Sequence, residues 1–493
     1  MIVGIDFGTT NSLVAYVDKT LRPEIIINER GARLTPSVVY FKNEKQVLVG
    51  ELAKSHALAR PEQTILRVKR KMGTSHHYII FGRQYTPSEI GGLIFQKLRQ
   101  YASNFLGEQV RQAVVTVPAY FDDNQRQGVL WAASLGGIEV VKLLNEPTAG
   151  ALAYGIHEKG DKRILVLDFG GGTFDITLMN CREGLFEVMG TGGSTELGGA
   201  DFDAVLVHWV AETVFEERGV DLERDPIAMH QLWIHAERVK MDLSSITEAS
   251  VIIPYLALTE DGPVHVHLAV SRQQFERLTA YLFERAFELI KVTLRDTGVL
   301  PQDIDVVILS GGSSRMPFFR ETVRSMFPQA VLRGEVNPDE VVALGAAVCA
   351  GILEGRLNHV EFRDILPHSL GVLDDDGCFV PVIERGTVYP AVATRMFTNT
   401  QDEQNQVTVA VLQERGERLL RLGYFHFHSP RRWKKGEARL AISFIVNDNG
   451  VLEVVAEDTD TGKAETLTIH GGVLEVTEER TALERRGIGL EVL

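Results

Sequence analysis

Two short segments of the sequence carry acidic, glycine and threonine residues in the same order. The apolar run VGID ends at Asp6, and the run LVLD ends at Asp168. The turn residues that follow are Gly8, Thr9 and Thr10 in the first segment and Gly170, Gly171, Gly172 and Thr173 in the second. Converging backbone N–H groups in a glycine turn bind phosphate oxygens, because no Cβ blocks the approach. Either turn alone indicates only a glycine hairpin, but the pair predicts two facing hairpins that hold a polyphosphate.

Carboxylates near these turns are candidates for binding Mg²⁺. Asp6 and Asp168 end their strands, and Glu146 lies in the segment LLNEPTAG. Magnesium prefers oxygen ligands and keeps several waters, so we expect it to be held largely through water. Glu146 has an alternative role, because it precedes Pro147 at the expected start of a helix and would compensate the helix dipole.

A lysine in the segment RVKRKMG is the candidate for bringing positive charge to the terminal phosphate. Lys69 would contact the γ-phosphate or orient the attacking water. Its neighbours Arg67, Arg70 and Lys71 are also cationic. From the pattern alone, a solvated basic face is the favoured interpretation of this segment.

The elements that must position these residues alternate between strands and helices. Both acidic segments read as strand, tight turn and strand, and a third run, VVILSGGSSRMP, places Gly311 and Gly312 after a strand in the same way. Amphipathic patterns predict helices after Pro87 and over residues 271–294. This alternation predicts an α/β core built from two related halves.

Bulk composition limits the classes of function. The chain has 493 residues, 44% of them hydrophobic, and a formal net charge of −15. Its length predicts two or three domains, and the acidic balance disfavours nucleic acid and anionic membranes as partners. No apolar run approaches the roughly 20 residues of a membrane helix. Cys181, Cys349 and Cys378 are scattered, which favours a reducing cytoplasm, with Cys349 as a buried packing thiol.

The pattern changes in the last quarter of the chain. From residue 363 to 471, short alternating strands are separated by the turn signals DDDG, NDNG and DTDTGK, which predicts a β-sandwich. We therefore expect a nucleotide-binding domain over 1–354, a connector over 355–362, the sandwich over 363–471 and a short tail over 472–493.

Several segments, in order and spacing, resemble the signatures of the heat shock protein 70 family. They are IDFGTTNS, VPAYFDDNQRQ, LLNEPTAGALAYG, LDFGGGTFD, LGGADFD, ERVKMDLSS, LSGGSSRMP and NPDEVVALGAAV. The resemblance covers residues 1–354 and, more loosely, the β-rich part through DILPHSLGV, VTVAVLQE and FIVNDNGVLEVVAEDTDTGK. It implies a two-lobed, actin-like ATPase domain followed by an all-β substrate-binding sandwich, which together form a chaperone that hydrolyses ATP.

Carried over residue by residue, the resemblance assigns roles around ATP or ADP and Mg²⁺. The hydrolytic centre would contain Lys69, Glu146, Asp168, Thr173 and Asp175. The phosphates and metal would be met by Asp6, Gly8, Thr9, Thr10, Gly170, Gly171 and Gly172, with Gly198 and Gly199 across the cleft. The adenosine would be held by Glu237, Lys240, Ser244, Gly311, Gly312, Arg315 and Asp339. Pro118 and Arg126 match residues that relay the nucleotide state to the sandwich.

The resemblance also implies partners. These are extended segments of client proteins, a J-domain co-chaperone and a nucleotide-exchange factor. The groove for clients would be lined by Val372, Asp375, Cys378, Phe397, Thr400, Val407 and Val409. An apolar groove suits an extended peptide, although strand alternation alone makes about half of these positions ordinary core. Asp375 and Thr400 fall where the family has apolar groups over the peptide, which predicts a narrow client range that tolerates basic residues.

The sequence departs from the family pattern at three further places. Met241 replaces an arginine that lies against adenine, which predicts weaker nucleotide binding. The connector NHVEFRDI offers only Val360, Phe362 and Ile365 in place of a leucine-rich linker, so interdomain coupling is in question. Residues 472–493 are too few for the helical lid, which predicts fast peptide release. These features resemble a divergent, lidless member of the bacterial HscC-like branch.

Two other functions share a nucleotide core of this kind. One is a small-molecule kinase or filament-forming ATPase, which has no counterpart of the terminal sandwich. The other is a nucleotide sensor that binds ATP without hydrolysing it. The presence of Lys69, Glu146, Asp168, Thr173 and Asp175 disfavours this alternative.

Overall fold

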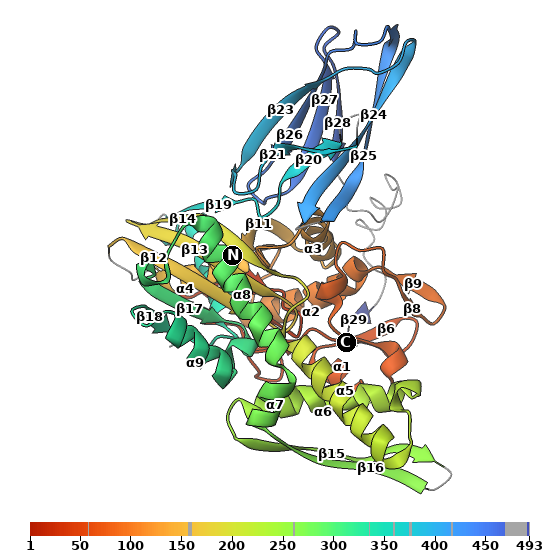
Figure 1. Ribbon diagram of the computed structural model, residues 1–493, viewed down its shortest axis with the longest axis vertical. Helices are drawn as coiled ribbons and strands as arrows, with labels where there is room; N and C mark the ends of the chain where they lie inside the picture. Colours follow the sequence, from red (N-terminus) through yellow and green to blue (C-terminus); the bar gives the residue numbers. More distant parts are fainter. Residues whose placement is uncertain are drawn as a thin grey trace.

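The computed structural model describes residues 1–493 except 58, 156–159, 260–261, 335, 358–359, 374–376, 416–417, 469–490 and 493. Two α/β lobes lie side by side, and a β-sandwich projects from one end of them (Figure 1). The expected fold class, a two-lobed α/β domain followed by an all-β sandwich, is confirmed. None of the described helices is both long and apolar enough to cross a membrane.

The first lobe is built on a mixed sheet. Its strands, in spatial order, are β11 (Glu139–Asn145), β10 (Gln112–Val117), β1 (Ile2–Asp6), β2 (Asn11–Val17) and β3 (Pro23–Ile25), with β4 (Thr35–Pro36) paired to β2. β1 and β2 are antiparallel, with Asp6 opposite Leu13, so residues 7–10 form the expected tight turn. Parallel pairing of β1 with β10 and of β10 with β11 brings the ends of three strands to the same edge.

Helices cover this sheet and define the core of the lobe. They are α2 (Pro87–Leu106) and α3 (Asp123–Leu135). α2 begins at Pro87 as predicted, because Thr86 and Glu89 form a capping box that satisfies the first backbone N–H groups. Strands β6 (Gln46–Val49), β5 (Val39–Phe41) and β7 (Thr64–Ile65), and helix α1 (Glu51–His56), extend the lobe, and β29 (Glu491–Val492) pairs with β6. The hairpin β8 (Tyr78–Ile80) and β9 (Arg83–Tyr85) completes it.

The second lobe repeats the arrangement of the first. Its seven-stranded sheet has the order β18 (Val331–Arg333), β17 (Val306–Ser310), β12 (Lys162–Phe169), β13 (Phe174–Arg182), β14 (Leu185–Ser194), β19 (Glu361–Ile365) and β22 (Val388–Tyr389). Asp168 of β12 is opposite Asp175 of β13 across the second glycine turn. β17 runs parallel to β12, with Ser310 beside Asp168, so the third predicted turn lies at the same edge of the sheet.

The helices of the second lobe agree with the sequence patterns except at one place. They are α5 (Gly199–Arg218), α6 (Pro226–Leu243), α7 (Arg272–Leu278), α8 (Ala280–Thr297) and α9 (Pro317–Met326), accompanied by the hairpin β15 (Glu248–Thr259) and β16 (Gly262–Ser271). The amphipathic pattern predicts one helix over residues 271–294, but the structure has two. Thr279 interrupts them because its hydroxyl donates to the carbonyl of Phe275 (2.8 Å) and its backbone leaves the helical conformation.

Two helices of small residues hold the lobes together. They are α4 (Glu146–Gly155) and α10 (Val341–Leu353). A Cβ on Gly345 of α10 would lie 1.7 Å from the carbonyl oxygen of Ala149 in α4, and one on Gly4 of β1 would lie 2.2 Å from the Ala347 nitrogen of α10. Side chains larger than glycine are therefore excluded at both contacts. Cys349 is buried in α10, and burial raises the pKa of its thiol to about 12, in agreement with a packing role.

The connector forms part of the second lobe. In β19, Phe362 pairs with Phe186 of β14 in parallel, while Asp364 pairs with Tyr389 of β22 in antiparallel orientation. A connector without the leucine-rich run therefore still adds a strand to the nucleotide-binding lobe. This strand crosses the boundary expected at residue 362.

The sandwich consists of two four-stranded antiparallel sheets. One has the order β21 (Phe379–Ile383), β20 (Leu370–Leu373), β24 (Gln404–Arg415) and β25 (Arg418–Trp433), and the other has β23 (Ala391–Phe397), β26 (Leu440–Val446), β27 (Leu452–Asp458) and β28 (Lys463–Thr468). Strict alternation of buried residues along β26 and β27 places one face of that sheet in the core. Trp433 and Phe427 are fully buried there. The expected tail over 472–493 lies outside the described residues apart from 491 and 492.

Candidate functional site

A cavity of about 570 Å³ lies between the two lobes. The first hairpin, the second hairpin and the turn after β17 all open into it. Most of the predicted site residues line it, namely Asp6, Gly8, Thr9, Thr10, Lys69, Glu146, Asp168, Gly170, Gly171, Gly172, Thr173, Glu237, Lys240, Ser244, Gly311, Gly312, Arg315 and Asp339. Residues separated by more than 300 positions in the chain therefore meet around one hollow.

The two glycine hairpins approach each other closely. A Cβ on Gly171 would lie 2.3 Å from the hydroxyl oxygen of Thr10, and one on Gly172 would lie 2.6 Å from that of Thr9. A larger residue at either glycine would have to displace the threonine side chain of the opposite hairpin. Glycine is therefore needed here for the approach of the opposite hairpin as well as for exposing backbone N–H groups to a ligand.

Gly198 and Gly199 lie behind the second hairpin and are not among the residues that line the cavity. The Gly199 N–H donates to the carbonyl of Gly170 (2.9 Å), and a Cβ on Gly198 would lie 2.6 Å from the carbonyl carbon of Gly172. The two glycines thus support the hairpin where α5 begins, rather than facing the hollow themselves.

Lys69 and Glu146 form a buried ion pair at the wall of the cavity. Their exposed fractions are 3% and 7%, and the Lys69 ammonium donates to Oε1 of Glu146. The short 3₁₀ turn Val68–Lys71 presents the lysine, and the first turn of α4 presents the glutamate. The interpretation of Lys69 as part of a solvated basic face is wrong, because the side chain is enclosed and paired. A buried charge pair that borders a cavity is a common feature of reactive sites.

Three aspartates gather beside this pair, and each has a raised pKa. Burial and the charge of Glu146 raise the pKa of Asp6 to about 7, although Lys69 and a hydrogen bond from Thr116 (3.1 Å) oppose the shift. Burial also raises the pKa of Asp168 well above its ordinary value, and it raises the pKa of Asp175 to about 7. The cluster has more buried negative charge than Lys69 balances, so an added cation would stabilise it.

The carboxylates suit Mg²⁺ held indirectly. Asp6, Asp168 and Glu146 all reach the cavity with oxygen ligands. Among the described residues, no three His, Cys, Asp or Glu side chains converge closely enough to hold a metal ion by themselves. An ion here would therefore complete its coordination with water and phosphate oxygens, which is the usual behaviour of Mg²⁺.

Asp175 lies just outside the cavity. It is 1% exposed and accepts a hydrogen bond from the backbone N–H of Tyr120 (3.0 Å). Because it pairs with Asp168 across the hairpin, it is placed behind the carboxylate that does reach the hollow.

At the other end of the cavity, the residues expected at adenosine form a polar wall. The Arg315 guanidinium binds Asp339 (2.7 Å), and the Lys240 ammonium donates to the carbonyl of Gly199 (2.9 Å). The Ser244 hydroxyl donates to the carbonyl of Lys240 (3.4 Å). Met241 also lines the cavity and is 64% exposed, so a side chain at this position is free to contact a ligand.

Several residues that line the cavity were not predicted from the sequence. They are Asn11, Leu13, Leu34, Ser245, Ser310, Ser313, Met316, Arg320, Pro338 and Val342. Six of them are adjacent to predicted residues, and extending each motif by one position would have found them; these six are Asn11, Ser245, Ser310, Ser313, Met316 and Pro338. Leu34 had no such signal, because the first lobe brings it to the cavity from a separate loop.

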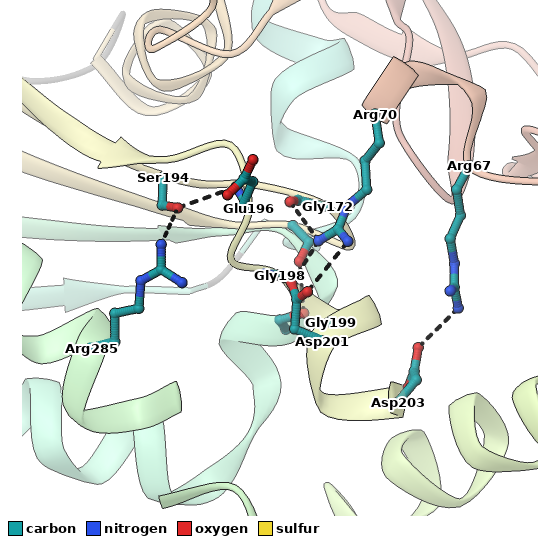
Figure 2. A network of polar contacts seen from close by, with 12 residues as sticks. Arg67, Arg70, Gly172, Ser194, Glu196, Gly198, Gly199, Asp201, Asp203 and Arg285 are labelled. Carbon is teal, nitrogen blue, oxygen red and sulfur yellow. Dashed lines mark hydrogen bonds and ion pairs between the residues drawn. The ribbon is translucent and has the colours of Figure 1, made fainter. Parts of the chain in front are cut away.

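The first lobe contacts the second across the cleft through Arg70. The Arg70 guanidinium donates to Asp201 (2.6 Å) and to the carbonyl of Gly172 (2.8 Å), as Figure 2 shows. Asp201 in turn accepts from the Gly198 N–H (2.7 Å) at the start of α5. The prediction of a solvated basic face is therefore wrong for Arg70 as well. Its side chain holds the second hairpin from the opposite lobe.

Arg126 connects the first lobe to the sandwich. Its guanidinium, 2% exposed, donates to Oδ1 of Asn145 (2.7 Å), and the Asn145 amide donates to Asp364 of β19 (2.6 Å). The carbonyl of Asn449, in the β26–β27 turn of the sandwich, lies 3.4 Å from the same guanidinium. Pro118 is buried just after β10, and the next residue, Ala119, accepts a hydrogen bond from the Arg126 guanidinium through its carbonyl (3.4 Å). Asn145 immediately precedes Glu146, so the network and the cavity share one stretch of backbone.

The residues predicted for a peptide groove are distributed differently. Val372, Val407 and Val409 belong to the buried core of the sandwich, and Phe397 packs against that core. Cys378 and Thr400 are exposed. Asp375 lies outside the described residues.

The chain was also compared with models of protein families. The model described as Hsp70 protein matches residues 2–80 and 77–485, which is nearly the whole chain.

Proposed function

The chain belongs to the Hsp70 family, and on that premise we propose that it is a chaperone that hydrolyses ATP between its lobes and binds extended client peptides through its sandwich. The observation that carries the proposal is the buried Lys69–Glu146 pair, which borders a cavity lined by two glycine hairpins and three carboxylates. Family members bind ATP or ADP with Mg²⁺, and the cavity contains side chains suited to both.

For hydrolysis, a water molecule must attack the γ-phosphorus while the bond to the β-phosphate oxygen breaks. The turns at Gly8–Thr10 and Gly170–Thr173 would hold the phosphates, and the Lys69 ammonium would balance charge on the γ-phosphate oxygens. Mg²⁺, when bound by Asp6, Asp168 and Glu146 through water, would supply further charge neutralisation.

The attacking water needs a group to orient it and accept its proton. Asp168 lines the cavity with a carboxylate, and next to Mg²⁺ it would be ionised, orient the water and accept its proton. Asp175 stands behind it with a pKa of about 7. We assign Asp168 to the water and Asp175 to the support of Asp168.

Coupling to the sandwich would use the network around Asn145. A nucleotide in the cavity would lie beside Glu146, and the adjacent Asn145 donates a hydrogen bond to Asp364 of the connector strand. A change of Glu146 position on hydrolysis would therefore alter the hydrogen bond that fixes the connector. This supports interdomain communication despite the unusual connector sequence.

Clients and co-chaperones are proposed on the family alone. We propose extended client segments bound by the sandwich, a J-domain protein that stimulates hydrolysis and a nucleotide-exchange factor, in the cytoplasm. The expected absence of a lid concerns residues that the structure mostly leaves undescribed.

A phosphate-release assay with and without an unfolded peptide tests the proposal. We expect slow basal turnover that rises when a peptide or a J-domain is added. Transfer of phosphate to a sugar would indicate a kinase instead, and binding of ATP without turnover would indicate a sensor. Either result would refute the proposed function.

A further inference from the structure

The short turn that presents Lys69 carries cations with separate partners. Lys69 pairs with Glu146 of its own side of the cavity, and Arg70 crosses the cleft to Asp201. Arg67, just before the turn, also crosses the cleft, whereas Lys71 is exposed to solvent. Lys69 has a role in the proposed hydrolysis, whereas Arg67 has none.

Arg67 makes two contacts with the second lobe. One guanidinium nitrogen lies 3.4 Å from Oδ2 of Asp203 in α5, a contact that Figure 2 shows. Its guanidinium carbon lies 4.5 Å from the centroid of the Trp233 ring in α6, within the range of a cation–π interaction. The backbone of Arg67 is left-handed, with φ of 57°, an uncommon conformation for a residue with a Cβ. Such a conformation persists where the surrounding contacts hold it.

Asp203 is the point at which this contact meets the nucleotide cavity. Its carboxylate is 2% exposed, and Lys240, which lines the cavity, places its ammonium 2.7 Å from the other oxygen, Oδ1. Lys240 therefore supplies the positive charge that faces this oxygen. A buried carboxylate requires compensating positive charge. Arg67 and Lys240 thus both supply positive charge to the buried carboxylate of Asp203.

We propose that Arg67, Asp203 and Trp233 form a latch across the cleft that closes when nucleotide occupies the cavity and slows its release. The proposal rests on nucleotide binding between the lobes. A ligand that attracts the Lys240 ammonium draws charge away from Asp203, which then depends more strongly on Arg67. Because coupling between two equilibria is reciprocal, a closed latch also favours bound ligand.

The geometry explains why the latch acts on release. Arg67 belongs to the first lobe, while Asp203 and Trp233 belong to two different helices of the second. Opening the cleft separates the guanidinium from both partners at once. Removing the latch therefore lowers the cost of opening and leaves the cavity wall itself intact.

The test measures dissociation of a fluorescent Mg·ATP analogue from the full chain by stopped flow, using Arg67→Gln and the matched control Lys71→Gln. Both variants lose one cation from the same segment. We expect dissociation from Arg67→Gln to be about tenfold faster, the size of a partly desolvated cation–π and ion-pair contact, and dissociation from Lys71→Gln to match the unchanged protein. Arg67→Lys, which keeps the charge but loses the flat stacking surface, should lie between them.

Two further variants separate a latch from a general structural role. Trp233→Leu should also accelerate nucleotide release. The double variant Arg67→Gln/Trp233→Leu should release nucleotide no faster than the faster of the two single variants, because both substitutions remove the same contact. Melting temperatures without nucleotide should be equal for Arg67→Gln and Lys71→Gln. Nucleotide addition should change Trp233 fluorescence in the unchanged protein but not in Arg67→Gln.

The outcomes distinguish the latch from the proposed function. Equal dissociation rates for Arg67→Gln and Lys71→Gln, or fully additive effects of Arg67→Gln and Trp233→Leu, would refute the latch while leaving ATP binding intact. Failure of the unchanged protein to bind nucleotide would refute both.

Discussion

The cavity between the lobes and the sandwich differ in where they place the residues predicted for binding. Around the cavity, residues from both lobes converge on one hollow of about 570 Å³. In the sandwich, Val372, Val407 and Val409 are buried in the core, while Thr400 and Cys378 are exposed. The same resemblance to a family thus identified a continuous surface in one region and a mixture of core and surface positions in the other.

The difference follows from the kinds of residue used. A phosphate turn needs glycine where chains approach closely, as at Gly171 and Gly172, and such a need leaves a strong local mark in the sequence. A groove in a sandwich is lined by the same valines that fill a core. Strand alternation identifies the inward face but does not distinguish a groove from packed interior.

Removing the buried cation of the cavity should give the largest effect. Lys69→Gln keeps a donor for Glu146 but loses the charge, so we expect ATP hydrolysis to fall by about 10²- to 10³-fold, the range for loss of one charge-stabilising donor. Binding of Mg·ATP should change much less. Single-turnover phosphate release measures the rate, and Lys71→Gln serves as the exposed control. Comparable rates for the two variants would exclude Lys69 from the chemistry.

The second prediction concerns the sandwich core. Val409→Ala should lower the free energy of unfolding by about 2 kcal/mol, because it leaves a cavity among packed side chains. Thr400→Ala, on an exposed position, should have little effect on stability. Chemical denaturation monitored by circular dichroism compares them. If Val409→Ala left stability unchanged but weakened peptide binding, Val409 would belong to an open groove and the contrast between the two regions would disappear.

The third prediction concerns the pH dependence of sandwich docking. Asp123 of α3 accepts a hydrogen bond from the Leu452 N–H (2.8 Å) in the sandwich, and burial raises the pKa of its carboxyl to about 7. Undocking exposes Asp123 and returns its pKa towards 3.8. Between pH 3.8 and about pH 7, Asp123 is therefore protonated in the docked state and ionised in the undocked state. Because docking then takes up a proton, docking weakens as the pH rises towards 7.

We expect docking to weaken by about 50-fold between pH 5 and pH 7, the change that follows from a carboxyl pKa near 3.8 in the undocked state and about 7 in the docked state. Energy transfer between a dye on the exposed Cys378 and a dye on Lys19→Cys in the first lobe measures docking. Asp123→Asn should flatten the profile. A profile as steep in Asp123→Asn as in the unchanged protein would assign the pH dependence to another group.

The smallest expected effect is at the rim of the cavity. Met241 is exposed and lines the cavity beside the residues proposed to hold adenosine, so Met241→Arg would provide a cation able to stack on the base. We expect nucleotide affinity to rise by about 2- to 30-fold, measured by titration calorimetry. Met241→Leu, which adds no charge, is the control. No gain for the arginine variant would show that Met241 does not weaken binding.

The sequence predicted local features well and distant pairings poorly. The two hairpins, the start of α2 and the change to a β-sandwich all follow from turn residues, caps and alternation within short windows. The partners of Arg67 and Arg70 are more than 100 positions away, in another lobe, and no local pattern identifies them. The strand β19 was also not foreseen, because its pairing with β14 depends on an available sheet edge rather than on its own composition.

In the proposed complex, the facing hairpins bind the phosphates of a nucleotide with the help of Mg²⁺. Titration calorimetry with ATP, ADP and adenosine, each with Mg²⁺ and with a chelator, measures how much of the affinity comes from these phosphates. We expect ATP and ADP to bind at least about 100-fold more tightly than adenosine, since charge-assisted contacts to phosphate provide most of the affinity, and we expect the chelator to remove much of this difference. Equal affinities for adenosine and ATP, unaffected by the chelator, would contradict the account.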